Sequence, residues 1–348
     1  MTIVVFCPNL IGDTVMATPA FRALRRGCAG ARLVGVIKPQ VAPTLDGAPW
    51  FDELVHFDPR GRDRPFWTPP VLRRLRDRRA EVAVLFPNSF RSALLAWRAG
   101  IPRRVGYSKS GRGLLLTDRL GWPRDRLGRR LPTPIVATYL DLVRRLGCPI
   151  DSARPELFTT EADEAAADRA WARLGLPRSE PVVCLNTGGA YGPAKSWPVE
   201  HFAALARRLA AEAGRAVLVV CGPAERDAAR AIAAGADHPR VVSLADQALG
   251  LGLTKACIRR AGLLITTDSG PRHFAAAFRV PVLTLFGPTF IAWTRTYHPR
   301  ALHVYHPVPC GPCQRPECPL GHHRCMRELS PDAVFRAALR LLPEATTA

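Results

Sequence analysis

The sequence lacks several features that mark common protein classes. No apolar run in its 348 residues approaches the roughly 20 residues that a membrane-spanning helix needs. Residues Thr2–Cys7 read as a strand, without the basic start and small-residue cleavage site of a signal peptide. Neither the G-x-G-x-x-G pattern of dinucleotide-binding loops nor a Walker A pattern occurs, which argues against an NAD-dependent oxidoreductase. We therefore expect a cytoplasmic protein of another class.

Lysine and acidic residues are both scarce relative to arginine. The 49 basic residues include only Lys38, Lys109, Lys195 and Lys255, and with 29 acidic residues the net charge is +20. Such an excess describes either a solvated basic surface or attraction to a phosphorylated lipid, a membrane face or nucleic acid. No zinc-finger spacing or ribonucleoprotein box accompanies the charge, so we expect no nucleic-acid partner.

The order of apolar runs and helical patterns predicts an α/β protein with parallel sheets. One series of strands begins at Ile3–Cys7, and a second begins at Val182–Leu185. The Arg-, Gly- and Pro-rich stretch Arg103–Pro134 reads as an irregular loop region. We expect a first Rossmann-like domain over residues 1–165 and a second over 166–328. Residues 329–348 should form a C-terminal helix, for which packing back on the first domain is one arrangement.

Two loops that follow predicted strands carry groups suited to chemistry. Asp13 lies after Ile3–Cys7, where either an N-cap or a catalytic carboxylate fits the pattern. The loop after Val182–Leu185 contains Thr187, Gly188, Gly189 and, further on, Lys195. Glycines allow backbone amides to approach an anion closely and the lysine adds positive charge, so this loop is a candidate diphosphate site.

Two further loops supply candidate groups. After Leu263–Thr266 come Asp268, Ser269, Gly270 and His273; Ser269 fits an N-cap, and a helix amino terminus there favours an anion. Asp268 could accept hydrogen bonds from sugar hydroxyls, and His273 either faces the ligand or packs in the first turn. Glu225 follows Val217–Cys221, where a carboxylate serves as a ribose ligand, as a first-turn helix acid, or as both.

Together these loops resemble those of the heptosyltransferase family of inverting glycosyltransferases, glycosyltransferase family 9, and within it most closely the ADP-heptose:lipopolysaccharide heptosyltransferase II branch. The resemblance covers nearly the whole chain. It is carried by NLIGDTVMA (Asn9–Ala17), PNSFRSAL (Pro87–Leu94), IPRRVGY (Ile101–Tyr107), GAYGPAKSWP (Gly189–Pro198) and TDSGPRHFAAA (Thr267–Ala277).

The resemblance implies a GT-B fold, in which two Rossmann-like domains face each other across a cleft. It implies that Asp13 is the general base, that Lys195 contacts the nucleotide diphosphate and that Glu225 binds ribose. Thr187, Gly188, Gly189, Asp268, Ser269, Gly270 and His273 complete the implied donor site. Asn88, Ser89, Arg103 and Arg104 are the candidate acceptor-side residues. The implied partners are ADP-heptose, a lipid-linked anionic oligosaccharide acceptor and, transiently, the inner face of the cytoplasmic membrane.

The expected reaction is a single in-line displacement at the anomeric carbon with inversion of configuration. A base activates the acceptor hydroxyl, and positive groups stabilise the departing diphosphate. The chain has no D-x-D triplet, so we expect no catalytic metal ion. Two alternatives remain: a GT-B enzyme that uses another nucleotide sugar, and a non-catalytic binder of an anionic polymer or membrane surface.

The ten cysteines fall into two groups. Six are scattered through predicted elements and read as reduced core residues. Cys310, Cys313, Cys318 and Cys325 cluster, with His322 and His323 between the last two. They offer enough soft ligands for a structural zinc ion, although the spacing is not that of a standard finger; reduced thiols or adventitious disulfides are the alternatives.

Overall fold

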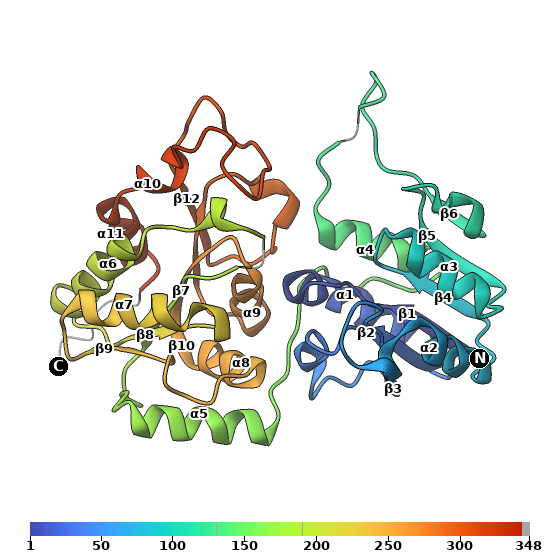
Figure 1. The fold of residues 1–348 in the computed structure, drawn as a ribbon, viewed down its shortest axis with the longest axis horizontal. Helices are drawn as coiled ribbons and strands as arrows, with labels where there is room; N and C mark the ends of the chain where they lie inside the picture. The colour runs from blue at the N-terminus through green and yellow to red at the C-terminus, as the bar shows by residue number, and fades with distance from the viewer. Residues whose placement is uncertain (130, 190, 343–348) are drawn as a thin grey trace. The chain divides into compact units, whose positions relative to one another are not determined.

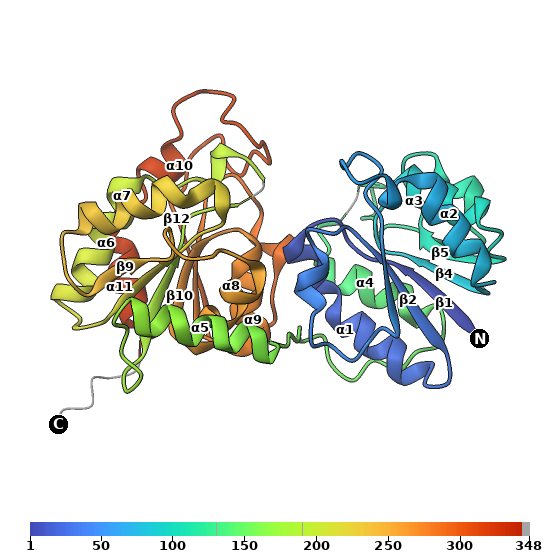
Figure 2. The same cartoon turned by 60° about the horizontal axis from the view of Figure 1, so that its bottom comes forward.

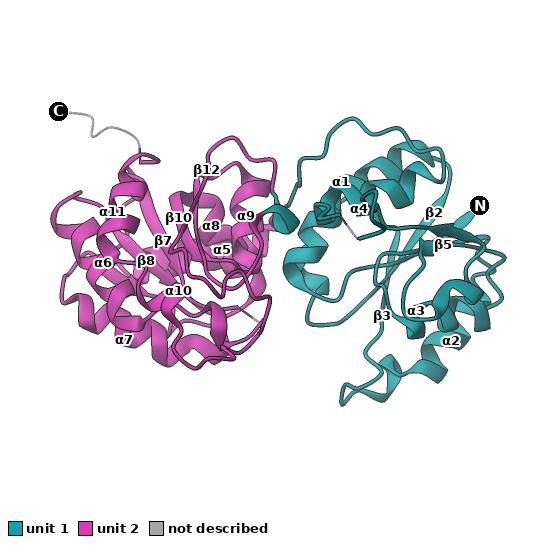
Figure 3. Ribbon diagram, turned by 90° about the horizontal axis from the view of Figure 1, so that it is seen from above, with its two compact units in different colours: residues 1–158, 292–295 teal, residues 159–291, 296–348 magenta. Residues whose placement is uncertain are grey.

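The computed structural model describes residues 1–129, 131–189 and 191–342 and divides into two compact units. The first comprises residues 1–158 with 292–295, and the second comprises residues 159–291 with 296–348 (Figure 3). The sequence placed the boundary between residues 165 and 166, within helix α5 (Glu161–Arg173), whereas the structure assigns the whole of α5 to the second unit.

The first unit is a parallel six-stranded sheet in the order β3-β2-β1-β4-β5-β6 (Figure 1). Its strands are β1 (Thr2–Phe6), β2 (Arg32–Ile37), β3 (Glu53–His56), β4 (Val82–Leu85), β5 (Arg103–Tyr107) and β6 (Asp118–Leu120). Its helices are α1 (Ile11–Gly27), α2 (Thr68–Asp77), α3 (Phe90–Arg98) and α4 (Ile135–Arg144). Strand β1 is central, with Val4 in register with Val34 of β2 and Ala83 of β4.

Alternation along β1 divides the core of this unit between the two faces of the sheet. Ile3 and Val5 pack in a cluster with residues of α1 and α4, whereas Val4 and Phe6 pack with residues of α2 and α3. The helices therefore cover both faces, as parallel sheets require. The irregular region predicted at Arg103–Pro134 is wrong in part, because β5 and β6 lie within it.

The second unit is another parallel six-stranded sheet, in the order β12-β11-β10-β7-β8-β9 (Figure 2). Its strands are β7 (Val182–Asn186), β8 (Val217–Val220), β9 (Val241–Ser243), β10 (Ala261–Thr267), β11 (Val282–Phe286) and β12 (Ala301–Tyr305). Besides α5, its helices are α6 (Val199–Ala211), α7 (Arg226–Ala236), α8 (Leu251–Arg260), α9 (Gly270–Phe278), α10 (Arg324–Arg327) and α11 (Pro331–Leu339).

The helices of this unit pack as two groups. α6 contacts α7 and α11, while α8 contacts α5 and α9. Helix α11 joins the second unit through α6, where the guanidinium of Arg208 lies 4.1 Å from the ring centroid of Phe335. Among the described residues, no helix combines the length and apolarity needed to cross a membrane.

Candidate active site

The strand order of the second unit brings two of the predicted loops together. The chain leaves β7 toward β8 on one side, and β10 then pairs with β7 on the other side. Ligands of open parallel sheets bind at such switch points, beyond the carboxyl ends of the strands. The loops that leave the sheet there are the glycine-rich loop after Asn186 and the Asp268–Ser269 turn before α9.

Asn186, the last residue of β7, ties these two loops together. Its buried side-chain amide donates to the Oγ1 of Thr266 and to the Oγ of Ser269, both at 3.0 Å. The same amide nitrogen lies 3.1 Å from the carbonyl oxygen of Gly188. One side chain therefore fixes the start of the glycine-rich loop relative to the start of α9.

Lys195 and Asp268 form a second link between the loops. The Lys195 ammonium donates to the Asp268 carbonyl oxygen at 2.8 Å and to its carboxylate at 2.7 Å, and it lies 4.4 Å from the centroid of the Tyr191 ring. The lysine side chain is 14% exposed and the aspartate 4%, so the lysine is the accessible partner. The Lys195 ammonium therefore lies beside the residue that precedes Ser269, the N-cap of α9.

Asp268 is surrounded by protein donors. Besides Lys195, its carboxylate accepts from Arg272 at 3.0 Å and from the Thr289 hydroxyl at 2.7 Å. Burial by itself would raise the pKa of the carboxyl, but the charges of Arg272 and Lys195 and the hydrogen bonds of Lys195 and Thr289 hold that pKa well below its usual value. This ionised, almost inaccessible carboxylate positions Lys195, which differs from the expectation that it faces a sugar.

At the start of α9, the groups that the helix offers to the candidate site are backbone amides more than side chains. Ser269 is the N-cap by position, yet its hydroxyl bonds Asn186 and Thr266 and makes no cap hydrogen bond to the helix. His273 is 3% exposed, and burial, reinforced by Arg272, lowers its pKa to about 3. The imidazole is therefore neutral and packed within the first turn near neutral pH.

Glu225, which follows the end of β8, lies beside the glycine-rich loop. Its carboxylate accepts from the Gly222 amide at 2.9 Å, and its Oε1 would lie 2.4 Å from a Cβ placed on Gly188. The Thr187 hydroxyl nearby is buried and has no hydrogen-bond partner among the described residues. Glu225, Thr187, Gly188 and Lys195 thus belong to loops that follow β7 and β8.

The first unit has its own set of residues at the carboxyl ends of its strands. Asp13 lies in the first turn of α1, whose N-cap is Leu10, so the interpretation of Asp13 as an N-cap is wrong. After β4, Ser89 caps α3 through its Oγ, which accepts from the Ser92 amide at 3.2 Å. Asn88 accepts from Arg112 at 3.0 Å.

Arg112 is fully buried and fixes the loop after β4. Its guanidinium donates to the carbonyl oxygens of Tyr107 and Pro87 and to the Asn88 side chain. Burial lowers its pKa to about 10, which still leaves the guanidinium charged near neutral pH. The sequence did not single out Arg112 as the residue that holds this loop, because arginines occur throughout the region.

Arg103 and Arg104 do not join Asn88 and Ser89. They begin β5, at the opposite end of the sheet from the loops that follow β1 and β4. Arg103 pairs with Asp118 at 3.1 Å, and Arg104 donates to the carbonyl oxygens of Ile101, Pro102 and Leu115. Both guanidiniums therefore hold the sheet margin together, away from the Asn88 loop.

Comparison with known proteins agrees with this arrangement. The family model for glycosyltransferase family 9 (heptosyltransferase) matches residues 70–324. Lipopolysaccharide heptosyltransferase 2 of Escherichia coli K12 is 27% identical over 98% of this chain and 99% of its own. The structure of E. coli ADP-heptose LPS heptosyltransferase II superposes with a TM-score of 0.78 at 24% identity, covering 98% of both chains. That of E. coli heptosyltransferase WaaC with ADP gives 0.72 at 16% identity, over 98% of this chain and 100% of that one.

The chain belongs to glycosyltransferase family 9. Its two parallel sheets with helices on their faces are the GT-B fold expected from the sequence. The family match and the full-length relative confirm that this protein is a glycosyltransferase.

Sequence reasoning missed part of the site of this family 9 enzyme. Thr289 and Arg272 complete the environment of Asp268, and Asn186 joins the loops. Asn186 could have been noticed as a polar residue at the end of an apolar strand. Thr289 could not, because it is separated in sequence from Asp268 and meets it only in the fold.

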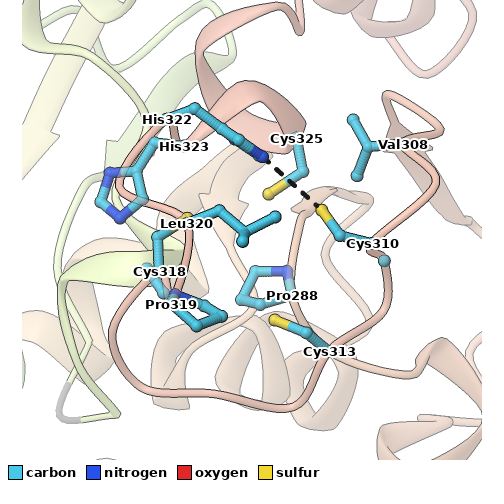
Figure 4. A pocket seen from close by; sticks show the side chains of 12 residues that line it. Pro288, Val308, Cys310, Cys313, Cys318, Pro319, Leu320, His322, His323 and Cys325 are labelled. Atoms are coloured by element: carbon cyan, nitrogen blue, oxygen red, sulfur yellow. Dashed lines mark hydrogen bonds between the residues drawn. The ribbon is translucent and has the colours of Figure 1, made fainter.

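The cysteine cluster of this glycosyltransferase lies in the second unit. Cys310, Cys313, Cys318 and Cys325 line one pocket together with His322 and His323 (Figure 4). As the described side chains are placed, no group of three or more His, Cys, Asp or Glu residues is arranged to hold a metal ion. The zinc expectation therefore rests on residue types and their shared pocket.

Proposed function

We propose that this glycosyltransferase transfers heptose from ADP-heptose to an inner-core acceptor of lipopolysaccharide, with inversion at the anomeric carbon. The proposal draws on the names of the relatives, heptosyltransferase 2 and ADP-heptose LPS heptosyltransferase II. The structural observation that carries it is the Lys195–Asp268 pair, which joins the glycine-rich loop to the start of α9.

In this proposal the second unit binds the nucleotide. Lys195 and the backbone amides at the start of α9 hold the diphosphate, because helix amino termini and ammonium groups both favour anions. Negative charge grows on that diphosphate as the glycosidic bond breaks, so fixed positive groups stabilise the transition state more than the ground state. Glu225 accepts hydrogen bonds from the ribose hydroxyls, and the Thr187 hydroxyl contacts the donor.

The first unit binds the acceptor in this proposal. Asp13 removes the proton of the acceptor hydroxyl as that oxygen attacks the anomeric carbon, since a protonated alcohol is a weak nucleophile. Asn88 and Ser89 contact the acceptor sugars. The acceptor is lipid-linked and anionic, so the enzyme works at the inner face of the cytoplasmic membrane, to which its net charge of +20 attracts it. No metal ion is needed for transfer.

The deciding experiment compares donors. Purified enzyme is incubated with a lipid-linked inner-core acceptor and either ADP-heptose or UDP-hexoses, and the product is identified by its mass. We expect transfer from ADP-heptose alone. Transfer from a UDP-sugar alone would replace this donor by another within the same fold, whereas binding of duplex DNA without any transfer would favour the non-catalytic alternative.

Lys195→Met tests the role of the Lys195–Asp268 pair directly. We expect it to weaken ADP binding at least tenfold, because the variant loses the accessible cation of the loop. Lys109→Met is the matched control, since Lys109 is exposed and lies in the first unit. Equal ADP affinity in wild type and Lys195→Met would contradict the assigned diphosphate site.

A further inference from the structure

The segment between β12 and α10 is unusual because few buried side chains hold it in place. Residues 306–323 form no helix or strand, and every one of them is at least partly exposed. Fixing each backbone residue costs roughly 1 to 2 kcal/mol of conformational entropy, which buried apolar surface here cannot offset. Long loops without secondary structure of their own are usually functional or disordered, and a cross-link that closes such a loop can stabilise it.

The cysteines are the groups in this segment that can supply a cross-link. All four line one pocket of about 250 Å³ with His322 and His323, and the Cys310 sulfur lies 3.9 Å from the Nε2 of His322 (Figure 4).

A tight turn follows one of the cysteines. The Gly321 amide donates to the Cys318 carbonyl oxygen at 3.1 Å. Gly321 has a φ of +68°, a backbone conformation that glycine adopts readily. After this turn His322 and His323 line the same pocket as Cys318.

We propose that Cys310, Cys313, Cys318 and Cys325 bind one zinc ion as thiolates and that this site fixes the 306–323 segment against the Lys195 loop. Four thiolates in a tetrahedron are a closed, structural ligand set for zinc. As placed, no three of these side chains converge on a single point, so coordination requires the thiols to rotate toward the centre of the pocket. All four are free thiols in the structure.

The second half of this proposal follows from contacts between the segment and the donor loop. The Tyr191 hydroxyl donates to the Gln314 carbonyl oxygen at 2.8 Å, and the Ala194 amide donates to that of Pro316 at 2.9 Å. Gly192 has a φ of +143°, and a Cβ there would lie 2.4 Å from the Pro316 oxygen. Residues 191–195 therefore pack against this segment, which supports their conformation.

The metal site therefore supports nucleotide binding without touching the nucleotide. Tyr191 lies beside the Lys195 ammonium, and Ala194 itself lines the cysteine pocket. Loss of the metal ion frees the segment, and the loop that carries Lys195 loses its support. This step rests on the proposed function, in which Lys195 binds the diphosphate of the donor.

The test measures metal and nucleotide separately. Untagged enzyme is purified under reducing conditions, and its metal content is determined by mass spectrometry; we expect about one zinc ion per chain. Cys313→Ser and Cys325→Ser should each lose it, whereas Cys28→Ser, in the first unit, should retain it. Cobalt added to the chelator-treated protein should show the thiolate-to-metal absorption of a tetrahedral site. Metal that is absent from the wild type, or that survives in both variants, overturns the site.

ADP affinity then tests the link to the loop. Removal of the metal by a chelator, or Cys313→Ser, should weaken ADP binding about tenfold, a typical coupling between two sites. Circular dichroism checks that the variants remain folded. Zinc present with ADP affinity unaffected by its removal overturns the support of the loop, and the proposed function then stands. Loaded wild type that fails to bind ADP contradicts the proposed function and leaves the zinc site standing.

Discussion

The Asp268 carboxylate is the most constrained single group of the donor site. It faces Arg272, which is fully buried, and removal of one partner of a buried pair leaves the other charge uncompensated. Asp268→Asn should therefore lower the free energy of unfolding by about 3 kcal/mol, measured by urea denaturation. Asp227→Asn is the control, since that carboxylate also pairs with an arginine but is 98% exposed. Equal losses in the two variants would contradict the assignment of Asp268 to a buried network.

Asp13 is the residue whose proposed role is purely chemical. Asp13→Ala should reduce kcat by roughly 100-fold to 10,000-fold, the usual contribution of a general base, while ADP affinity stays the same. Transfer rates and calorimetric ADP binding measure the two effects. The control is Asp77→Asn, at the end of α2. Transfer that survives within a few-fold in Asp13→Ala would exclude the residue as the base.

His273 gives the donor site a pH signature. Its pKa is near 3 in the folded chain against 6.5 unperturbed, so below pH 6.5 the unfolded chain binds the proton first. Stability should fall as pH drops from about 6.5, with a slope of about 1.4 kcal/mol per pH unit from this group. His273→Gln should flatten the profile between about pH 6 and pH 5, where few carboxyl groups titrate. Gly250→Ala, which removes no titratable group, should leave it unchanged.

At the level of whole elements, the close approach of the β7 and β8 loops depends on one glycine. Gly188→Ala would place a Cβ 2.4 Å from the Glu225 Oε1, so the carboxylate must leave its bond with the Gly222 amide. We expect ADP binding to weaken about tenfold, with little change in the unfolding midpoint, because a flexible side chain can move. Gly250→Ala is the control, since a Cβ there meets nothing within 4 Å. In Gly188→Ala/Glu225→Ala the glycine change should have no added effect; full additivity would contradict the contact.

The strands also show how much of the fold could be predicted from the sequence. Buried strands such as β7 and β10 are mostly apolar runs and were predicted at nearly their observed bounds. Strands β5, β6 and β12 were missed. Arg103–Tyr107 starts with two exposed or half-buried arginines, Asp118–Leu120 has only three residues, and Ala301–Tyr305 is a half-buried edge strand. Their pairing comes from the neighbouring strand, which local composition does not encode.

The candidate site was predictable to the same degree. Loops that follow strands were identified because parallel strands deliver their carboxyl ends to one edge of the sheet. The role of the Asp268 carboxylate in a buried network was not predictable. Its partner Arg272 follows it by one helical turn, and its partner Thr289 comes from the loop beyond β11. Arg103 and Arg104 were misplaced for a related reason, since finding β5 was necessary to know that they begin a strand.

For the molecule as a whole, the net charge of +20 predicts attraction to anionic membranes. A candidate contact is the turn at residues 124–129, where Leu127 is 75% exposed beside Arg126. Vesicles containing phosphatidylglycerol should sediment the enzyme at low salt, and phosphatidylcholine vesicles should not. Binding should fall as ionic strength rises, because salt screens exposed charges.

The variant Arg126→Gln/Leu127→Ser tests whether this turn makes the contact. One basic residue near an anionic surface contributes about 1 kcal/mol and one inserted leucine about 2 kcal/mol, so vesicle affinity should fall at least tenfold. Arg62→Gln, an exposed charge elsewhere in the first unit, should cost at most the few-fold expected of a long-range charge. If the two variants bind equally, attraction is spread over the whole basic surface and the turn has no special part in it. Transfer to a soluble acceptor fragment should be measured for both variants, because residues 62 and 126 lie in segments that follow the carboxyl ends of β3 and β6.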